Sequence, residues 1–490
     1  MPTKQKSLKI NFIMNAVLTV SNIIFPIITF PYASRVLTPS GTGKVSAAVA
    51  FVAFFNLFAQ LGIPTYGVKA CARVRDNREE LTRTAHELLM INLIMSFVMY
   101  VLLCFAIVFF PVLKDEKTLY VIVSATILLN SLGMEWLYKA LEQYTYIAVR
   151  SVIFKFIAMI LMFVLIHSPK DYALYGLVSI IASSASYIMN FINVRKYIDI
   201  KPVGGYNLLR HLKPVGIYLG MACATTIYTI LDRVMLRFMT DDIEVGLYDA
   251  AVKIKYVLQM LVTSLGAVLL PRVSYYLKNN ENEEFKRITS KALSFVFVFS
   301  SAVSVYFIIL SKQSVLLISG SLYSGAILPM QIIMPTVLLI GISNIFGIQM
   351  LIPLGREKEL LFAEIGGAII DMVINFILIN SLRSAGVAIG TLIAELFVTT
   401  YLFIVLRKDL RGMIDRIDLL KIMASLLLAF AVLMATNYFV AGIKIADELG
   451  YVKDLVITFL TFLLAYLGML LLLREKMALE IVGILMRKKK

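Results

Sequence analysis

Residues 86–111 read HELLMINLIMSFVMYVLLCFAIVFFP and hold no charged side chain beyond the second position. A helix needs about 20 apolar residues to cross the hydrocarbon core of a bilayer, so this stretch predicts a transmembrane helix. Similar stretches fill the rest of the chain and predict an all-α membrane protein with fourteen transmembrane helices. The predicted spans are 10–34, 45–66, 86–111, 119–138, 148–167, 172–193, 214–237, 246–270, 292–311, 326–352, 361–381, 385–406, 419–440 and 455–473.

The composition of the whole chain agrees with this class. Of 490 residues, 60% are hydrophobic and 16% are charged, whereas soluble domains have about 45–50% apolar and about 25% charged residues. The three cysteines, Cys71, Cys104 and Cys223, are scattered, which argues against a disulfide scaffold. Three histidines and the absence of a CxxC pair argue against a zinc site. We expect no metal and no cofactor.

The distribution of the basic residues predicts the topology. With the N-terminus in the cytoplasm, the predicted cytoplasmic segments hold 33 of the 47 Lys and Arg residues, and the external segments hold 9. This asymmetry follows the positive-inside rule and places both termini in the cytoplasm. The net charge of +16 is therefore a feature of membrane topology, and no nucleic-acid partner is expected. The final run, 487–490, is interpreted as an anchor near anionic lipid headgroups.

The two halves of the chain contain similar stretches. RVL at 35–37 and GKVSAAV at 43–49 match RVM at 233–235 and GLYDAAV at 246–252. The alternative is chance similarity between apolar helices, but the shared order of Arg, Gly and Ala-Ala favours duplication. Six spans per copy is an even number, so the repeat predicts two pseudo-symmetric six-helix lobes related by an axis along the membrane normal. The predicted domains are 1–200, 201–410, and 411–490 with the last two spans and a basic tail.

Several basic residues fall within or at the ends of predicted spans. A charge near the bilayer centre costs about 2.5–3.5 kcal/mol on insertion scales, and such a side chain usually faces a protein interior or water. These residues therefore predict a cationic cavity between the lobes. An alternative for Arg237 and Lys255, which lie near helix ends, is that the side chain extends to the membrane surface. The candidates are Arg35, Arg233, Lys253, Lys155 and Arg237.

Acidic residues in the spans have two interpretations. Asp371 and Glu395 are proton or sodium sites, or they make structural bonds to the neighbouring Asn375 and Thr391. Asp232 points about 100° away from the adjacent arginine on a helix and is expected to pair with another helix.

Two further acids flank the single tryptophan. Glu135 is expected to pair with Lys155, and Glu142 with a neighbouring cytoplasmic loop. Trp136 is expected to be an anchor at the membrane interface, where tryptophan is enriched.

The sequence contains none of the short catalytic motifs that we considered. It lacks GxxxxGK[ST], so the chain is not expected to hydrolyse ATP, and it contains neither HExxH nor GxSxG. We therefore expect a carrier that is not an enzyme.

Several short stretches, spread over the whole chain, form a recognisable set. They are NFIMN at 11–15, FPI at 25–27, PYASRVL at 31–37, QLGIPTYG at 60–67, EWLYKALE at 135–142, LDR at 231–233, GLYDAAVK at 246–253, NFILI at 375–379, GVAIG at 386–390, and Glu395. In order and spacing they resemble bacterial polysaccharide flippases of the Wzx type, in the multidrug/oligosaccharidyl-lipid/polysaccharide exporter superfamily.

The resemblance implies a V-shaped pair of lobes that works by alternating access in a bacterial plasma membrane. It implies a substrate of undecaprenyl-pyrophosphate-linked oligosaccharide, with capsule units and teichoic-acid precursors open, carried from the inner to the outer leaflet. Membrane lipids and a polysaccharide polymerase or other assembly protein are the implied partners. By analogy with related lipid II flippases, which hold pyrophosphate with basic cavity residues, Arg35, Arg233 and Lys253 are the first candidates for phosphate contacts.

Sugars need hydroxyl, amide and aromatic partners, although packing is the default interpretation of such residues inside spans. The candidates are Tyr218, Tyr228, Asn344, Gln349 and Asn375. Two rival functions use the same spans. A cation-coupled multidrug exporter of the same superfamily would need an acidic cavity, and a membrane scaffold for a polysaccharide synthase would have little need of buried charges.

Overall fold

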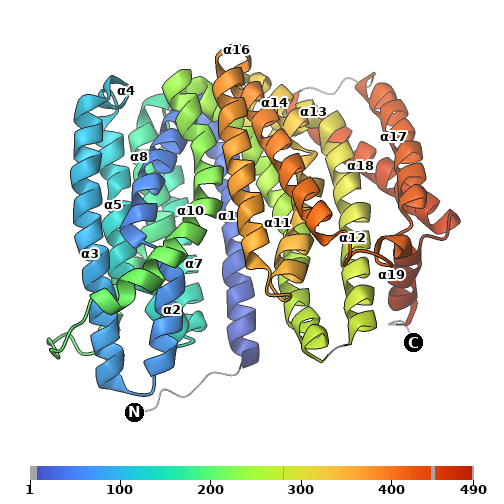
Figure 1. Cartoon of the computed structure of the whole chain (residues 1–490). Helices are drawn as coiled ribbons and strands as arrows, with labels where there is room; N and C mark the ends of the chain where they lie inside the picture. The colour runs from blue at the N-terminus through green and yellow to red at the C-terminus, as the bar shows by residue number, and fades with distance from the viewer. Residues whose placement is uncertain (1–7, 280, 443–446, 488–490) are drawn as a thin grey trace. The chain divides into compact units, whose positions relative to one another are not determined.

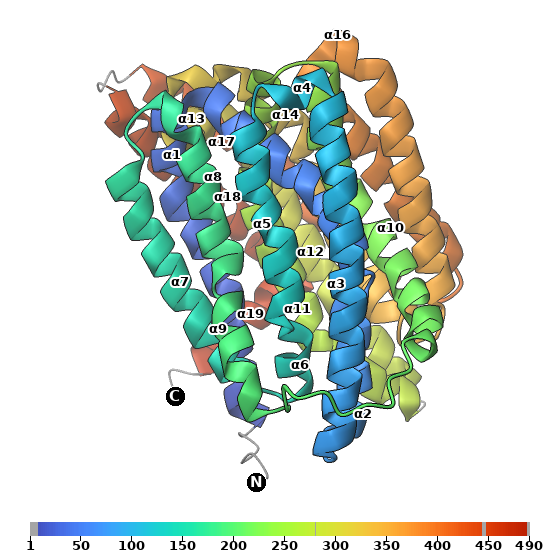
Figure 2. The ribbon, with the colours of Figure 1, turned by 90° about the vertical axis from the view of Figure 1, so that its left-hand side faces the viewer.

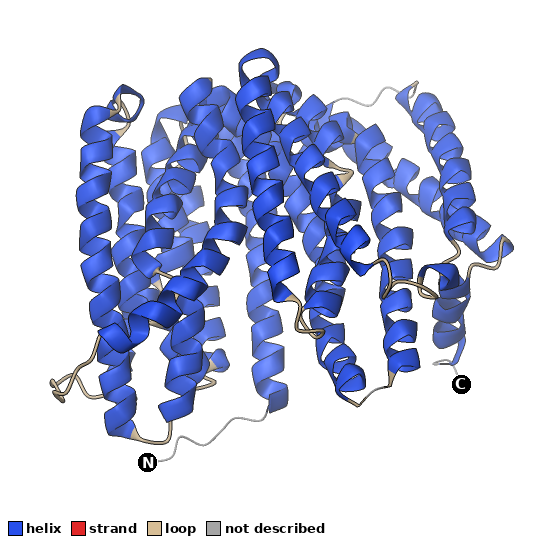
Figure 3. Ribbon diagram, viewed as in Figure 1, coloured by secondary structure: helices blue, strands red, loops and turns tan. Residues whose placement is uncertain are grey.

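The computed structural model describes residues 8–279, 281–442 and 447–487, and within these ranges every regular element is a helix (Figure 3). The chain divides into two compact units, Met1–Gly246 and Leu247–Lys490. The longer helices of the first unit are α1 (Leu8–Gln60), α2 (Ile63–Val74), α3 (Arg78–Phe109), α5 (Lys117–Gly133), α6 (Glu135–Ala140), α7 (Tyr144–Leu165), α8 (Tyr172–Ile180), α9 (Tyr187–Asn193) and α10 (Leu209–Met239). Short helices α4 (Pro111–Lys114), η1 (Pro169–Asp171), η2 (Ile181–Ala185) and η3 (Val194–Lys196) connect them.

Helix α11 (Asp242–Lys278) begins at the end of the first unit and continues into the second (Figure 1). The remaining helices are α12 (Asn282–Ile309), α13 (Ser311–Ser319), η4 (Ser321–Ala326), α14 (Ile327–Ile333), α15 (Thr336–Asn344), η5 (Ile345–Leu351), α16 (Glu357–Leu406), η6 (Ile414–Arg416), α17 (Leu419–Ala441), α18 (Asp447–Leu472) and α19 (Lys476–Arg487).

The helices confirm a multi-pass membrane protein. Among the described residues, nine helical stretches are long and apolar enough to cross a membrane, or ten if the pair Ser321–Ile333 and Thr336–Leu351, bent by 44°, is one span. Two of the nine correspond to two predicted spans each: Ile13–Val74 covers 45–66 and most of 10–34, and Glu357–Leu406 covers 361–381 and 385–406. The predicted spans on α10 and α11, which carry most of the intramembrane charges, are not among the nine. Fourteen spans and two symmetric lobes therefore stay predictions.

The two longest helices are each interrupted, as membrane thickness requires. At 1.5 Å per residue, the 53 residues of α1 and the 50 residues of α16 would measure about 80 and 75 Å if straight, more than twice the hydrocarbon thickness of about 30 Å. Helical geometry breaks at Thr38 in α1 (φ 63°, ψ 172°) and at Arg383 in α16 (φ 51°, ψ −129°). Each break lies between two predicted spans.

Helix α16 folds back on itself at its break. A Cβ on Gly367 would lie 2.6 Å from a methyl group of Val398, and a Cβ on Gly386 would lie 2.7 Å from the Leu378 carbonyl oxygen. These contacts pair residues at nearly equal distances before and after Arg383. The two arms of α16 are therefore an antiparallel hairpin, whose orange arms meet at the upper edge of Figure 1.

In the first unit, α5 packs against α3 and α8, and α8 packs against α7, so these helices lie side by side (Figure 2). Helix α10 packs against α1 and α2. The first unit accordingly includes α10 and ends at Gly246, and the predicted domain boundaries at 200 and 410 stay predictions.

The expectation that Trp136 is an interfacial anchor is wrong. Its side chain is 3% exposed and belongs to a core cluster with Ile63, Cys71 and Leu88. A Cβ on Gly67 would lie 2.9 Å from the indole ring, so the ring packs directly on the α2 backbone. The left-handed conformation of Met134 (φ 42°) separates α5 from α6, which carries Trp136. The sequence alone does not show this break.

Candidate functional site

The two copies of the sequence repeat touch each other through their glycines, in the first unit. A Cβ on Gly43 would lie 1.7 Å from the Asp242 carbonyl oxygen, and a Cβ on Gly246 would lie 2.0 Å from the Pro39 carbonyl oxygen. Gly43 and Gly246 are equivalent in the repeat, and so are Pro39 and Asp242, because both pairs are 203 residues apart. A reciprocal contact of this kind is what two-fold related copies make. We name this the glycine contact.

Replacing Gly246 with alanine is expected to separate the two backbones at the glycine contact. Overpacking of this kind costs about 1–3 kcal/mol, so the purified G246A protein should melt at a lower temperature than the wild type. G468A on α18 is the matched control, since a Cβ there would meet no described atom within 4 Å apart from the adjacent backbone of its own helix. Equal melting temperatures for G246A and the wild type would contradict the close approach.

Arg237 lies in an ion-pair cluster beside the glycine contact. Its Nε is 3.0 Å from a carboxylate oxygen of Asp242, and Lys44 Nζ is 2.5 Å from Glu116. The Lys44 ammonium also lies 4.6 Å from the centre of the Tyr172 ring. Burial raises the pKa of Asp242, in the turn between two predicted spans, while Arg237 and Lys44 oppose the shift. Arg237 is therefore held inside the protein, which disagrees with a side chain extended to the membrane surface.

Arg35 and Arg233 are both half-buried. Arg35 lies on α1 three residues before the break at Thr38, and its Nη1 donates a hydrogen bond of 2.8 Å to the Pro31 carbonyl oxygen. Arg233 lies on α10 one turn before Arg237, on the same face of the helix. The adjacent Asp232 is buried, and its pairing with another helix stays a prediction.

Lys155 joins α7 to the first half of α1. Its Nζ donates a hydrogen bond of 2.8 Å to Ser21 Oγ and a second one to Asn22 Oδ1. Neutral oxygens accept from this ammonium, so Lys155 connects two helices of the first unit.

The expectation that Glu135 pairs with Lys155 is wrong. The Glu135 carboxylate binds Arg150 at 2.8 Å and Lys139 at 2.9 Å. Arg150 is buried and also donates a hydrogen bond of 2.6 Å to Ser186 Oγ. The Glu135 carboxylate therefore has its basic partners nearby. Lys155 lies about a turn and a half further along α7 than Arg150, beyond the reach of this group.

Glu142 bonds a neighbouring loop, and the cytoplasmic position of that loop stays a prediction. Its carboxylate binds Arg75 at 2.9 Å, and Arg75 lies in the segment between α2 and α3. Glu135 and Glu142 therefore each form structural ion pairs in the first unit, with different basic partners.

In the second unit, α11 and the α16 hairpin share a polar cluster. Lys253 Nζ lies 2.7 Å from a carboxylate oxygen of Asp249, which is one turn earlier on α11 and buried. The preceding residue, Tyr248, hydrogen-bonds through its hydroxyl to Thr391 Oγ1 at 3.1 Å. This bond connects the charged turn of α11 to the second arm of α16.

The first arm of α16 completes the polar cluster. A Cβ on Gly390 would lie 2.1 Å from Asn375 Oδ1 and 3.1 Å from Asp371 Oδ1, so both side chains point at the second arm. Asp371, Asn375 and Glu395 are all buried. Glu364, which the sequence analysis did not single out, interacts electrostatically with Glu395. Because Glu364 is a charged residue within the apolar span 361–381, the sequence could have identified it as a candidate.

The polar residues predicted as sugar partners differ in how deeply they are buried. Gln349 and Asn375 are buried, Asn344 and Tyr218 are half-buried, and the Tyr218 ring packs 6.0 Å from the ring of Tyr66. The side chain of Tyr228 lies outside the described residues. In the described part of the chain, no group of three or more His, Cys, Asp or Glu side chains is placed to hold a metal ion.

Comparison with known proteins adds sequence relatives. A family model described as polysaccharide biosynthesis protein matches residues 8–277. A putative O-antigen transporter of Shigella dysenteriae is 26% identical over 388 residues, which cover 78% of this chain and 96% of that protein. A putative O-antigen transporter of Escherichia coli strain K12 is 23% identical over 414 residues and covers 84% and 99%.

Solved structures share the fold at low sequence identity. The lipid II flippase MurJ in an inward closed conformation aligns with a TM-score of 0.74 and 16% identity, over 95% of this chain and 100% of that one. An inward-facing multidrug resistance transporter of the MATE family aligns with a TM-score of 0.63 and 15% identity, over 81% and 96%.

Proposed function

Because this chain belongs to the polysaccharide biosynthesis protein family, we propose that it is a flippase for a lipid-linked saccharide. The observation that carries the proposal is its alignment with two putative O-antigen transporters over 96% and 99% of their lengths. The family match agrees with the Wzx-type resemblance of the short sequence stretches. The proposed direction is from the inner to the outer leaflet of a bacterial plasma membrane, with both termini in the cytoplasm.

We propose undecaprenyl pyrophosphate as the carrier, joined to an O-antigen-type, capsule or teichoic-acid-type saccharide. Such a headgroup cannot cross hydrocarbon unaided, because its polar groups would lose their hydrogen bonds to water. Arg35, Arg233 and Lys253 are the proposed phosphate contacts, since a guanidinium fork matches phosphate oxygens and an ammonium supplies a compact charge. Arg237 and Lys155 complete the proposed cationic lining, with Asp242 beside the first and Ser21 beside the second.

Transport is proposed to proceed by alternating access. Moving one negative charge outward is favoured by about 2.3 kcal/mol per 100 mV of interior-negative potential, so the membrane potential assists export of a pyrophosphate. Asp232, Asp371 and Glu395 are the proposed positions for a coupled proton or sodium ion. A polysaccharide polymerase or another assembly protein is the proposed partner that receives the product.

Depletion of the protein in its host is expected to cause a lipid-linked saccharide to accumulate in the inner leaflet. The measurement is mass spectrometry of extracted polyprenyl-linked lipids, combined with surface glycan staining. Restored expression of the wild-type chain should reverse both changes. Unchanged lipid-linked intermediates together with normal surface glycan would contradict the proposal.

A multidrug exporter is the second candidate, favoured by the MATE-like fold and by the buried acids Asp371 and Glu395. Export of cationic drugs would lower their accumulation in cells that express the chain, whether or not the host makes the saccharide. A flippase should instead leave drug accumulation unchanged. Drug accumulation, compared between cells with and without the chain, therefore distinguishes the two functions.

A further inference from the structure

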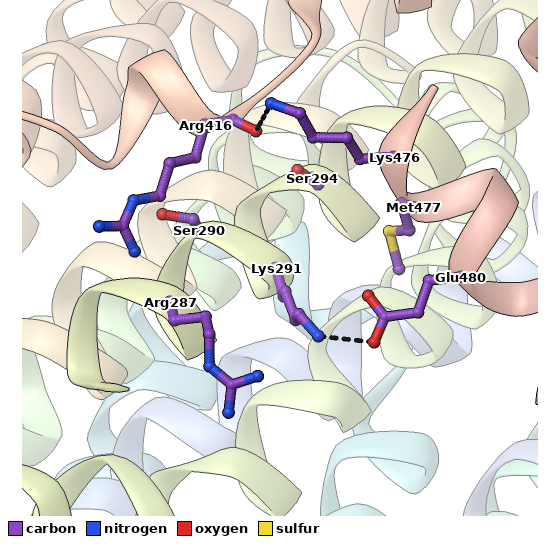
Figure 4. Close-up of a pocket in the computed structure, with 8 residues that line it drawn as sticks. All are labelled: Arg287, Ser290, Lys291, Ser294, Arg416, Lys476, Met477 and Glu480. Carbon is purple, nitrogen blue, oxygen red and sulfur yellow. Dashed lines mark hydrogen bonds and ion pairs between the residues drawn. The ribbon is translucent and has the colours of Figure 1, made fainter. Parts of the chain in front are cut away.

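A basic pocket of about 390 Å³ lies in the second unit where α12, η6 and α19 meet (Figure 4). Four cationic side chains and one carboxylate line it, together with Ser290, Ser294 and the thioether of Met477. The charged residues are Arg287, Lys291, Arg416, Lys476 and Glu480. Each of these cations has a carboxylate partner, so an anion would bind through the donors that the ion pairs leave unused. The pairs are Arg287–Glu284, Lys291–Glu480, Arg416–Glu283 and Lys476–Asp418.

Ion pairs hold these cations in place without covering them. Lys291 Nζ lies 2.5 Å from Glu480, which joins α12 to α19, and one nitrogen of Arg416, Nη2, lies 2.6 Å from Glu283. Lys291 keeps 47% of its side-chain surface exposed, and Arg416 keeps 39%. Because a guanidinium has five N–H groups and an ammonium has three, donors remain for a further anion.

An apolar groove of about 230 Å³ lies between α12 and α18. Aromatic rings dominate it, including the stacked pair Phe462–Tyr466 and the ring of Tyr306 beside Phe459. The Tyr306 hydroxyl donates to the Leu455 carbonyl oxygen at 2.7 Å, and the Tyr466 hydroxyl donates to a backbone oxygen of α12 at 3.0 Å. The backbone therefore binds both hydroxyl groups, and the groove wall is hydrocarbon.

The pocket and the groove adjoin along α12. Ser294 lines the pocket, the next residue, Phe295, lines the groove, and Met477 of α19 lines both. The groove side of α12 runs from Phe295 to Phe307, which is about 18 Å at 1.5 Å per residue. One leaflet of a bilayer has about half of the 30 Å hydrocarbon thickness. A chain of one-leaflet length therefore fits the groove with its polar end at the pocket.

We propose that this composite site binds an anionic glycerophospholipid, with its phosphate in the basic pocket and one acyl chain in the apolar groove. The segments that supply the cations, at 272–291, 407–421 and 474–490, are the ones for which the charge distribution predicts a cytoplasmic position. The cytoplasmic leaflet is rich in anionic lipids, which bind basic pockets between membrane helices. The inference goes beyond the proposed transport function and does not depend on it.

The test uses the full-length protein in a neutral detergent. Native mass spectrometry would count bound lipids after addition of phosphatidylglycerol, phosphatidylcholine, undecaprenyl phosphate or inorganic phosphate, and a melting curve would be recorded for each mixture. Phosphatidylglycerol should bind and raise the melting temperature, while phosphatidylcholine and inorganic phosphate should do so much less. The double variant R287Q/K291Q should weaken phosphatidylglycerol binding by about tenfold or more.

The matched control is K358Q/K408Q, which removes two exposed charges on the same predicted side without changing the pocket lining. It should bind phosphatidylglycerol like the wild type. A302W, which fills the groove, should weaken phospholipid binding and leave the weak phosphate response unchanged. Equal binding of phosphatidylcholine and phosphatidylglycerol, stronger binding of undecaprenyl phosphate, or an equal response to inorganic phosphate would each overturn the proposal.

Discussion

Replacing Arg233 with alanine is expected to abolish glycan export while the protein still reaches the membrane. Arg233 lies on α10 one turn before Arg237, whose pair with Asp242 and the neighbouring glycine contact fix that end of the helix. A charge-assisted hydrogen bond contributes about 1.5–3 kcal/mol, which corresponds to roughly 10- to 150-fold in binding. Lys253→Ala is expected to have the same effect, with surface glycan and membrane protein measured in the same cells.

Controls separate the loss of a phosphate contact from the loss of any positive charge. Arg411→Ala and Lys312→Ala remove exposed cations and should leave export unchanged. Arg233→Lys keeps the charge without the planar fork and should restore part of the export. Full export by both R233A and K253A would remove these residues from the proposed phosphate site.

Replacing Glu87 with alanine is expected to cause the largest loss of stability, about 3–5 kcal/mol, because it breaks a buried ion-pair network. The Glu87 side chain is fully buried and accepts hydrogen bonds from the Asn207 backbone N–H at 2.7 Å and from Arg210 Nε at 2.9 Å. His211 Nε2 lies 2.7 Å from the same carboxylate, and its Nδ1 lies 2.8 Å from the Tyr66 hydroxyl. One acid thus fastens the start of α10 to α3.

Thermal unfolding of the purified protein in detergent would measure this effect. Glu79→Ala is the matched control, because Glu79 is 67% exposed and pairs with Arg83 at the same end of α3. An exposed pair of this kind contributes about 0–1 kcal/mol. Similar melting temperatures for E87A and E79A would show that the network does not stabilise the protein.

Hydropathy predicts the most apolar helices well and misses the polar ends. Predicted span 419–440 matches α17 (Leu419–Ala441) closely. Predicted span 86–111, in contrast, belongs to α3, which begins at Arg78. Asn77 caps that helix by accepting hydrogen bonds from the N–H groups of Glu79 and Glu80, a polar signal that a search for apolar runs does not register.

The partners of buried charges could not be predicted from spacing alone. Glu135 and Arg150 pair across the turn between α6 and α7, where Glu142 takes a left-handed φ of 56°, so the expected pair with Lys155 does not form. In contrast, the sequence repeat identifies the two glycines that meet in the structure. Gly43 and Gly246 occupy equivalent positions, and the structure brings each against the backbone of the other copy, where a side chain would clash.

Translocation in reconstituted vesicles tests the central claim most directly. The purified chain would be placed in liposomes that contain a labelled undecaprenyl-pyrophosphate-linked saccharide, and a membrane-impermeant reagent would report how much of the saccharide reaches the opposite leaflet. We predict rapid translocation with the wild-type protein and near-background translocation with R233A. A wild-type rate equal to that of protein-free liposomes, in vesicles where the same protein moves a cationic drug, would contradict the account.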